Sequence, residues 1–249
     1  MLRSSLVLAA GLVLALSFSA VAADTARGEE AKPALTKGDR IVFLGDSITQ
    51  GGGGPKGYIT LVKKGVDEKL PDASIECLNA GISGNKVPDL LRRLQKDVLD
   101  KKPTLVFIYI GINDVWHWQK KQDGTMAGGT PKDKYEAGLK EIIGKIKDAG
   151  ARVILCTPSV IGEKEPGTND RDKMLDEYAD ISRAVAKDTG LPLLDLHKAF
   201  QDYEKANNKE NKPSGVLTTD GVHLNDAGNR FVADQMLGAL GIQAAAPKE

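Results

Sequence analysis

Hydrophobic and polar residues divide the chain into short apolar runs that alternate with amphipathic segments. Five apolar runs have the length of buried strands, and each ends at a Gly, a Pro or a polar residue. The predicted strands are Ile41–Leu44, Ser74–Leu78, Thr104–Ile110, Arg152–Thr157 and Pro192–Leu196. Between them, hydrophobic residues recur at three- and four-residue spacing, which predicts helices. The predicted helices are Gly57–Leu70, Val87–Leu99, Lys132–Ala149, Asn169–Thr189 and one that begins at Asn225, after a polar stretch from Tyr203 to Thr219.

Strands that alternate with amphipathic helices predict an α/β fold with a parallel sheet and helices on both faces. The carboxyl ends of such strands lie at one rim of the sheet, where loops carry the chemistry. Ser47 follows the first predicted strand, and Gly84 and Asn113 lie in the loops after the second and third. Asp220 and His223 lie in a later loop that can reach the same rim.

The first 23 residues have the pattern of a cleavable signal peptide. A positive charge at Arg3 precedes an apolar stretch from Leu6 to Phe18, and Ala20–Ala23 supplies the small residues of a cleavage site. The apolar stretch is shorter than the ~20 residues of a membrane span. We therefore expect a secreted or periplasmic protein with no stable membrane insertion after cleavage. The expected organisation is a signal peptide at 1–23, a linker at 24–37, one α/β domain at 38–243 and a tail at 244–249.

The composition narrows the possible partners. Lys and Arg number 34, and so do Asp and Glu, so no net field favours nucleic acid or an anionic membrane surface. Gly52–Gly57 fits G-x-G-x-x-G in form, but its first Gly comes eight residues after the strand ends, and Pro55 interrupts it. The dinucleotide fingerprint needs these glycines at the strand-to-helix turn. No cofactor is expected, no metal is required, and no nucleic-acid partner is expected.

Several residues match the needs of a serine nucleophile. Such a nucleophile requires a base, a group that orients the base, and donors for the developing oxyanion. The chain has three His, and His223 follows Asp220 by three residues, so one loop can present both imidazole and carboxylate. Asn113 carries a side-chain amide donor, and Gly84 lies in a small-residue loop that allows close approach to the backbone.

Four sequence blocks together resemble those of the SGNH, or GDSL-like, hydrolases. The blocks are Gly45–Ile48, Asn79–Gly84, Gly111–Asp114 and Asp220–His223, in the family's order. The resemblance implies a flavodoxin-like, three-layer α/β/α sandwich with a five-stranded parallel sheet in the order 2-1-3-4-5. It implies a catalytic triad of Ser47, Asp220 and His223. It also implies an oxyanion hole made by the backbone of Ser47 and Gly84 and the side chain of Asn113. Ile112 stands where the family commonly has Gly, which could alter the wall beside Asn113.

The resulting functional hypothesis is an exported serine esterase. Its expected substrates are short-chain carboxylic esters, acetyl esters above all, on a carbohydrate or another small molecule. A lysophospholipase, thioesterase or arylesterase of the same family is the alternative. A non-catalytic carbohydrate-binding module is a second alternative, which has no need of all four residue types at the site.

Other polar and aromatic residues near the predicted rim have open or structural interpretations. Trp116, His117 and Trp118 begin the long loop Asp114–Pro131 and form either a sugar or acyl contact or a packing lid. His197 is expected to be a partly buried, hydrogen-bonded residue at the start of a helix. Asp46 and Asp114 are expected to brace their turns.

The two cysteines, Cys77 and Cys156, lie at the ends of predicted strands. With the strand order that the family resemblance implies, two strands separate them, at ~4.8 Å per step. That separation exceeds the ~7 Å Cα distance that a disulfide spans. Two free thiols are expected.

Overall fold

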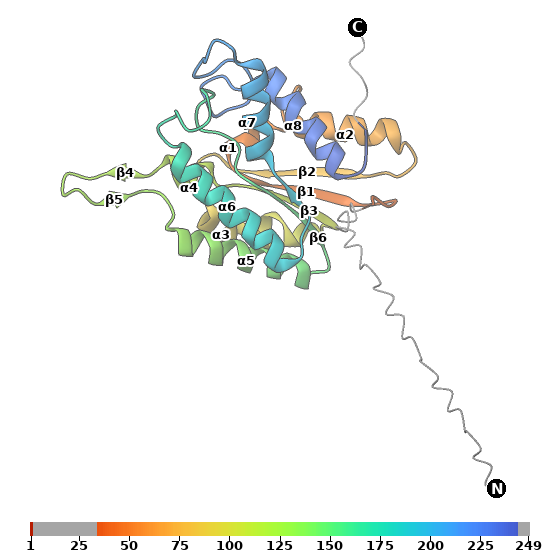
Figure 1. Ribbon diagram of the computed structural model, residues 1–249. Helices are drawn as coiled ribbons and strands as arrows, with labels where there is room; N and C mark the ends of the chain where they lie inside the picture. The colour runs from red at the N-terminus through yellow and green to blue at the C-terminus, as the bar shows by residue number, and fades with distance from the viewer. Residues whose placement is uncertain (2–33, 244–249) are drawn as a thin grey trace. The chain divides into compact units, whose positions relative to one another are not determined.

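A five-stranded parallel sheet organises residues 34–243, which together with Met1 are the residues that the computed structural model describes (Figure 1). The strand order is β2-β1-β3-β6-β7. The strands are β1 (Arg40–Gly45), β2 (Glu76–Gly81), β3 (Leu105–Tyr109), β6 (Arg152–Cys156) and β7 (Leu193–Leu194). In the order of their appearance along the chain this is 2-1-3-4-5, so the predicted topology is confirmed. The predicted signal peptide, the linker up to residue 33 and the tail at 244–249 lie outside the described residues.

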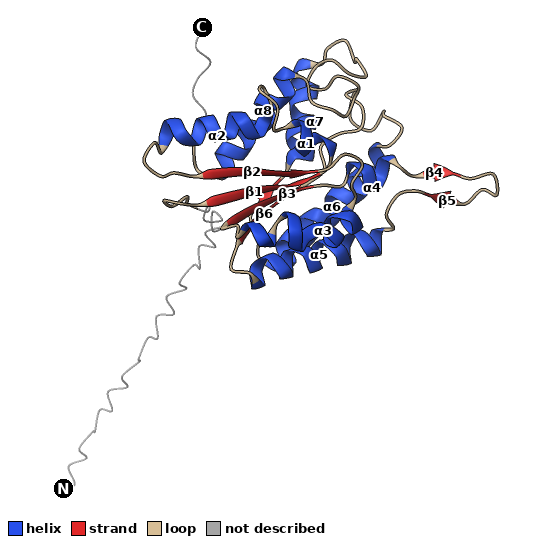
Figure 2. Ribbon diagram, turned by 180° about the vertical axis from the view of Figure 1, so that it is seen from behind, coloured by secondary structure: helices blue, strands red, loops and turns tan. Residues whose placement is uncertain are grey.

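Helices cover both faces of the sheet, which confirms the predicted three-layer α/β/α class. Figures 1 and 2 show α2 and α8, packed on each other, with α7 on one face, and α3, α5 and α6 on the other. The helices are α1 (Ser47–Gly51), α2 (Tyr58–Lys69), α3 (Val87–Asp97), the 3₁₀ helix η1 (Leu99–Lys101), α4 (Ile112–Trp116), α5 (Lys132–Asp148), α6 (Asp172–Thr189), α7 (Leu196–Asn207) and α8 (Asp226–Ala239).

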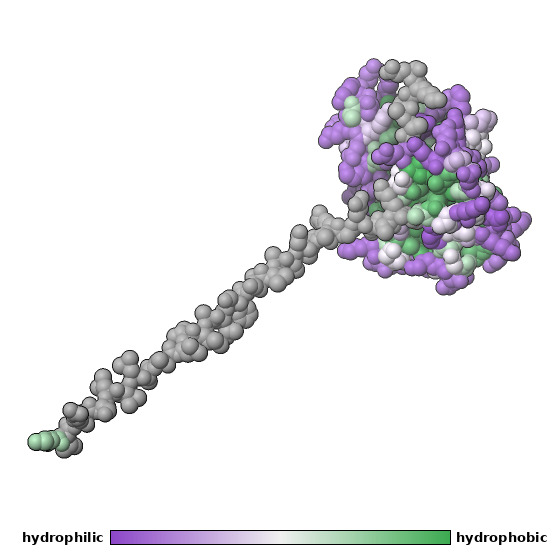
Figure 3. All heavy atoms as spheres, turned by 90° about the vertical axis from the view of Figure 1, so that its right-hand side faces the viewer, coloured by the Kyte–Doolittle hydropathy of each residue, from purple (hydrophilic) through white to green (hydrophobic). Residues whose placement is uncertain are grey.

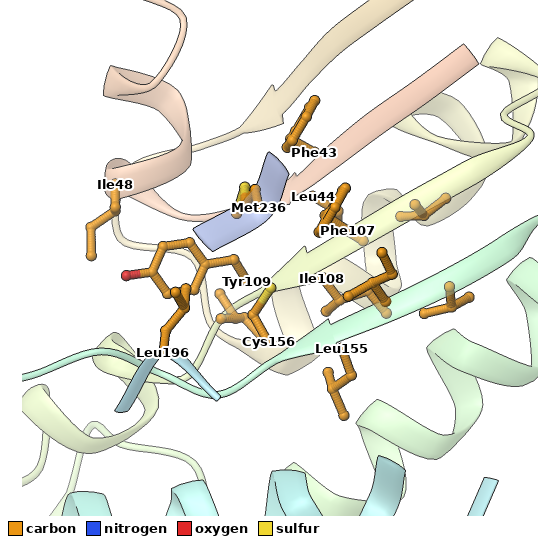
Figure 4. Packing of buried hydrophobic residues seen from close by; sticks show 14 of the residues in the cluster. Phe43, Leu44, Ile48, Phe107, Ile108, Tyr109, Leu155, Cys156, Leu196 and Met236 are labelled. Atoms are coloured by element: carbon orange, nitrogen blue, oxygen red, sulfur yellow. The ribbon is translucent and has the colours of Figure 1, made fainter. Parts of the chain in front are cut away.

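The core lies along the two central strands, β1 and β3. Every residue of β3 is buried, and so are Ile41–Gly45 of β1, because helices cover both sides of these strands. The rings of Phe43 and Phe107 stack with their centroids 5.3 Å apart (Figure 4). Burial of such a side chain contributes about 1.5–3 kcal/mol to stability. The strand ends that carry the polar site residues are therefore set on the most rigid part of the fold.

Three local features differ from the sequence prediction. The second strand begins and ends later than expected and pairs with β1 as far as Gly45 opposite Gly81. Helix α7 extends to Asn207 into the stretch expected to be polar loop, because Phe200 and Glu204 are buried on one of its faces. The loop Asp114–Pro131 contains a small antiparallel hairpin of β4 (Gln119–Lys120) and β5 (Met126–Ala127), which projects from the sheet layers in Figure 1.

Both cysteines are free, as expected. Cys77 lies on β2 and Cys156 on β6, and β1 and β3 separate them in the sheet. Burial raises the pKa of the Cys77 thiol to about 12 and that of Cys156 higher still. Both sulfurs therefore stay protonated and poorly reactive at neutral pH.

The surface of residues 34–243 is largely hydrophilic on the face shown in Figure 3, around one hydrophobic patch. In the part of the chain that the structure describes, we find no helix that is both long and apolar enough to traverse a lipid bilayer.

Candidate active site

Ser47 lies at the carboxyl end of β1 and is the first residue of the short helix α1. Asp46 caps this helix, and its Oδ1 accepts the Ile48 N–H at 2.9 Å. Gly81 at the end of β2 lies against α1, where a Cβ would come within 2.1 Å of the Gln50 nitrogen. The glycine thus lets the turn with Ser47 sit directly on the neighbouring strand. Asp46 braces this turn, as the sequence analysis expected.

Asp220 and His223 lie in the loop before α8 and reach Ser47 across 176 residues of sequence. Ser47 Oγ is 3.0 Å from His223 Nε2, and His223 Nδ1 is 2.7 Å from Asp220 Oδ2. The other Asp220 oxygen accepts the N–H groups of Val222 and His223. Burial raises the pKa of Asp220, but the hydrogen bonds from the His223 ring and these N–H groups outweigh burial and lower that pKa overall. Asp220 is thus a carboxylate at neutral pH and holds one side of the imidazole ring.

The loop that carries Asp220 and His223 is attached to a buried carboxylate, Glu163. This side chain is fully buried and accepts the N–H groups of Val216, Leu217 and Thr218 at 2.7, 2.5 and 2.6 Å. The neighbouring Gly162 N–H donates to the Gly221 carbonyl at 2.8 Å. Two adjacent residues therefore hold the loop on either side of Asp220.

Asn113 and the Gly84 loop also meet beside the turn that carries Ser47. Asn113 is 4 % exposed, and its amide nitrogen donates to the Asn85 carbonyl at 3.0 Å. Gly84 has a φ of +74°, a backbone conformation that favours glycine. The adjacent Ser83 N–H donates to Gln50 Oε1, which ties this loop to α1. The structure thus brings together the three elements that the family resemblance assigns to an oxyanion hole.

Arg93 of α3 contacts both the end of β1 and the loop after Gly84. Its half-buried guanidinium donates to the Gly45 carbonyl at 2.8 Å and to Asn85 Oδ1 at 2.6 Å. A third contact, to Asp97 at 3.2 Å, orients the guanidinium along the helix. Arg93 therefore links the strand end before Ser47 to the residue whose carbonyl receives the Asn113 amide. The sequence analysis missed both Arg93 and Glu163, because each resembles an ordinary surface residue in the sequence.

Two buried acids lie just behind the site. Burial, with a smaller contribution from the charge of Asp114, raises the pKa of Asp46 to about 7. Burial likewise raises the pKa of Asp114 to about 6, although its hydrogen bond from the Val87 N–H opposes the shift. Asp114 joins α4 to the start of α3 through this bond, which is the bracing role expected for it.

The structure separates the three residues of the Trp-His-Trp segment. The Trp116 ring lies edge-to-face with the His223 ring, with centroids 6.2 Å apart, and Trp116 is 38 % exposed. The Trp118 indole N–H instead donates to the Tyr178 hydroxyl of α6, beside a cavity of about 260 Å³. His117 is partly buried, and burial and the nearby Lys86 lower its pKa. Trp116 alone of the three makes contact with the residues of the expected triad.

His197 is buried and takes no part in this constellation. Its Nδ1 lies 2.5 Å from the Ser159 carbonyl oxygen, and its Nε2 lies 2.7 Å from Asp176 Oδ1. These contacts fix the start of α7, which agrees with the structural interpretation of this residue. Within residues 34–243, no three His, Cys, Asp or Glu side chains are grouped so that they could hold a metal ion.

This chain is similar to known esterases in both sequence and structure. The model of the GDSL-like Lipase/Acylhydrolase family matches residues 43–231. An acetylxylan esterase of Geobacillus stearothermophilus is 31% identical over 222 residues, which cover 84% of this chain and 97% of that protein. The isoamyl acetate-hydrolyzing esterase 1 homolog of Rattus norvegicus is 29% identical over 78% of both chains. The crystal structure of the acetyl xylan esterase AlAXEase is similar with a TM-score of 0.75 and 45% identity, over 81% of this chain and 99% of that one.

Proposed function

Because this chain belongs to the GDSL-like lipase/acylhydrolase family and is a carboxylic ester hydrolase, we propose that it removes acetyl groups from carbohydrate esters through a Ser47–His223–Asp220 triad. The match also confirms the family that the four sequence blocks indicated. The observation that supports the triad is the continuous chain of contacts, 3.0 Å from Ser47 Oγ to His223 Nε2 and 2.7 Å from His223 Nδ1 to Asp220 Oδ2. These distances suit proton transfer between nucleophile and base.

The proposed reaction has two acyl-transfer steps. His223 Nε2 takes the Ser47 proton as Oγ attacks the ester carbonyl, and the resulting imidazolium protonates the departing alcohol as the C–O bond breaks. A water molecule then attacks the acyl-enzyme with His223 again as base, which releases acetate and restores the Ser47 hydroxyl. Asp220, ionised because its pKa is lowered, holds Nδ1–H and stabilises the imidazolium.

The tetrahedral intermediate carries a negative charge on the former carbonyl oxygen. In this proposal the backbone N–H groups of Ser47 and Gly84 and the Asn113 amide receive that charge. The contact of Asn113 with the Asn85 carbonyl supports the proposal, because it places the amide on the Gly84 loop. Loss of one such donor typically lowers turnover about 10²–10³-fold.

The acetyl and carbohydrate preferences rest on the relatives. Two acetylxylan esterases, from Geobacillus stearothermophilus and Xylanibacter ruminicola, are 31% and 28% identical to this chain. An arylesterase of Vibrio mimicus is 29% identical over 47% of this chain, which keeps aryl esters as the second candidate class. A non-catalytic carbohydrate-binding module is disfavoured by the assembled Ser47, His223 and Asp220.

We propose in addition that the enzyme is exported. The pattern of residues 1–23 supports a cleaved signal peptide and a secreted or periplasmic enzyme. Mass spectrometry of the protein made with its full leader in a secreting bacterial host tests this, and we expect a mature chain that begins near Asp24. An intact Met1 in exported material would contradict cleavage.

Hydrolysis of p-nitrophenyl esters tests the chemistry. Wild-type enzyme and Ser47→Ala are compared on the acetate, butyrate and octanoate esters, and acetate release is measured from acetylated xylo-oligosaccharides. We expect rates that fall with chain length for the wild type, release of acetate from the sugar, and loss of both activities in Ser47→Ala. Equal rates for the two proteins would exclude Ser47 as the nucleophile.

A further inference from the structure

A groove of about 530 Å³ lies directly beside the proposed triad. Its lining combines Trp116 and Asp220, which contact His223, with the polar side chains of Gln119, Lys164, Asp170 and Arg171 and the apolar side chains of Ile161, Pro213 and Val222. Sites of about 300–1,000 Å³ hold ligands of drug-like size. The groove is therefore much larger than an acetyl group requires, and some other part of the substrate must occupy it.

The groove offers unused hydrogen-bonding groups. The side chains of Gln119, Lys164 and Asp170 are exposed and make no hydrogen bond or ion pair with any other residue of the described chain. Arg171 uses one nitrogen to bind the Trp118 carbonyl, which holds its guanidinium at the groove wall. A hydrocarbon chain laid here would cover these groups without giving them partners, at a cost of about 1–3 kcal/mol each. A polyhydroxylated ligand would supply both donors and acceptors.

Next to the proposed triad, the groove has an aromatic, apolar wall. Trp116, partly exposed, lies edge-to-face with the His223 ring, so its indole forms an apolar wall next to the base. Indole combines a large apolar face with rigid geometry, and a pyranose ring likewise has an apolar C–H face and a polar rim. A sugar ring on Trp116, with hydroxyls of the oligosaccharide on Gln119, Lys164 and Asp170, would match this mixed lining.

The direction of the reaction fits this arrangement. His223 protonates the departing alcohol, and Trp116 and Asp220 contact both His223 and the groove. We propose that this groove is a glycan subsite that binds the alcohol part of the ester, an oligosaccharide of at least two rings, and makes the enzyme selective for esters of glycans. The assignment rests on the proposed esterase function and specifies the substrate class of that site.

Selectivity ratios test the subsite. kcat/KM is measured on acetylated xylotetraose and on p-nitrophenyl acetate for the wild type, Trp116→Ala, Lys164→Ala and the control Lys69→Ala, an exposed lysine at the end of α2 outside the groove. We expect the ratio of the two kcat/KM values, sugar over aryl ester, to fall about tenfold or more in Trp116→Ala and severalfold in Lys164→Ala. Lys69→Ala should keep the wild-type ratio. Circular dichroism and thermal melts establish that each variant is folded.

Deacetylated xylotetraose provides a second probe that does not depend on sugar-ester turnover. It should inhibit p-nitrophenyl acetate hydrolysis competitively in the wild type, and its inhibition constant should rise in Trp116→Ala and Lys164→Ala. Absence of activity on every ester in the wild type would refute the esterase proposal itself. Activity with an unchanged ratio in both groove variants would overturn only the subsite. A selective loss on p-nitrophenyl octanoate would also overturn it, because the groove would then hold the acyl chain.

Discussion

The two halves of the candidate site are supported in different ways. The half with Ser47 grows out of β1, a strand paired on both sides, and is capped by Asp46 and backed by Arg93. The half with Asp220 and His223 is a loop whose only described strand-like pairing is the bridge between Thr218 and Leu224. Its position depends on side chains, Glu163 foremost, that bind its backbone N–H groups. The half with Ser47, the proposed nucleophile, is thus held by strand pairing and side chains together. The half with Asp220 and His223, the proposed acid–base pair, is held mainly by Glu163 and the adjacent Gly162 N–H.

The largest effect should come from the contact that joins the two halves. Ser47→Ala and His223→Ala are each expected to lower kcat by roughly 10⁶-fold, because neither nucleophile nor base acts without the other. The double variant should be no less active than the single ones. Kinetics on p-nitrophenyl acetate, with wild-type contamination excluded by separate purification, measure this. A further large loss in the double variant would mean that the two residues act independently.

The second prediction concerns the support of the acid–base half. Glu163→Ala leaves three N–H groups of this loop without their acceptor, at about 1–3 kcal/mol each. The free energy of unfolding should therefore fall by roughly 3–5 kcal/mol. We expect kcat to fall about 10²-fold, because the displaced loop carries the proposed base, and KM to change less than kcat, because Trp116 at the other wall of the groove stays in place. Urea denaturation and steady-state kinetics measure both quantities.

Glu165→Ala is the matched control for this experiment. Glu165 is exposed two residues away, and its side chain accepts no hydrogen bond from the loop that carries His223. It should retain wild-type stability and kcat. If Glu163→Ala behaved like Glu165→Ala, the acid–base half would not depend on this carboxylate.

A smaller and pH-dependent effect should appear on the nucleophile half. The Asp46 carboxyl has a pKa near 4 in the unfolded chain and a pKa of about 7 in the folded one. Between these values the folded state holds a proton that the unfolded state has lost, so stability falls as the pH rises from 4 to 7. Asp46→Asn removes this loss and keeps an acceptor for the Ile48 N–H. Its stability relative to the wild type should therefore rise across that interval by roughly 2–4 kcal/mol.

Urea denaturation of both proteins at pH 4.5, 5.5, 6.5 and 7.5 measures the difference. A constant offset between wild type and Asp46→Asn at all four values would contradict a raised pKa for Asp46. Asp220, whose pKa is lowered, should add no trend in this interval, because its contribution to stability is complete above its unfolded pKa near 4 and is lost only as the pH falls below that value.

The smallest predicted effect concerns the support behind the nucleophile. Arg93→Lys cannot maintain the forked contacts to the Gly45 carbonyl and Asn85 Oδ1 at once. We expect kcat to fall about tenfold, with KM nearly unchanged, because the β1 ladder still holds Ser47. Arg92→Lys, at an exposed position one residue earlier, should be neutral in the same assay. A loss from Arg93→Lys as large as that from Glu163→Ala would remove the difference between the two halves.

The sequence predicted the sheet well because the sheet is built from local signals. The buried runs that became β1 and β3 have apolar residues on both faces, whereas the order of the strands came from the family resemblance and not from these local signals. Ser47, Gly84 and Asn113 were singled out because each lies in the loop after a strand, in a block that resembles those of the family. The hairpin of β4 and β5 was missed, since its two-residue strands are polar and carry no periodic pattern.

The supports of the site could not be predicted from local sequence. Glu163 stands in a loop rich in Gly, Pro and charged residues, where an acid is normally exposed, and its three hydrogen-bond partners lie 53–55 residues later. Arg93 lies on the polar side of an amphipathic helix, and its partner Gly45 is 48 residues earlier. Only the packing of the elements determines which charged residue becomes buried. The same holds for Trp116, which points to His223 while Trp118, two residues on, packs against α6.

The long separation between Ser47 and His223 has a consequence for how the enzyme matures. Helix α8, which follows His223 directly, packs on α2 near the start of the domain, and the Tyr58 N–H binds Asn229 Oδ1 across 171 residues. Closing so long a loop is slow, and pairings of this kind form late in folding. In the proposed triad, a chain that ends before residue 223 has Ser47 without its base. Hydrolytic activity therefore reports on completed synthesis and folding of the whole domain, and incomplete chains stay inert.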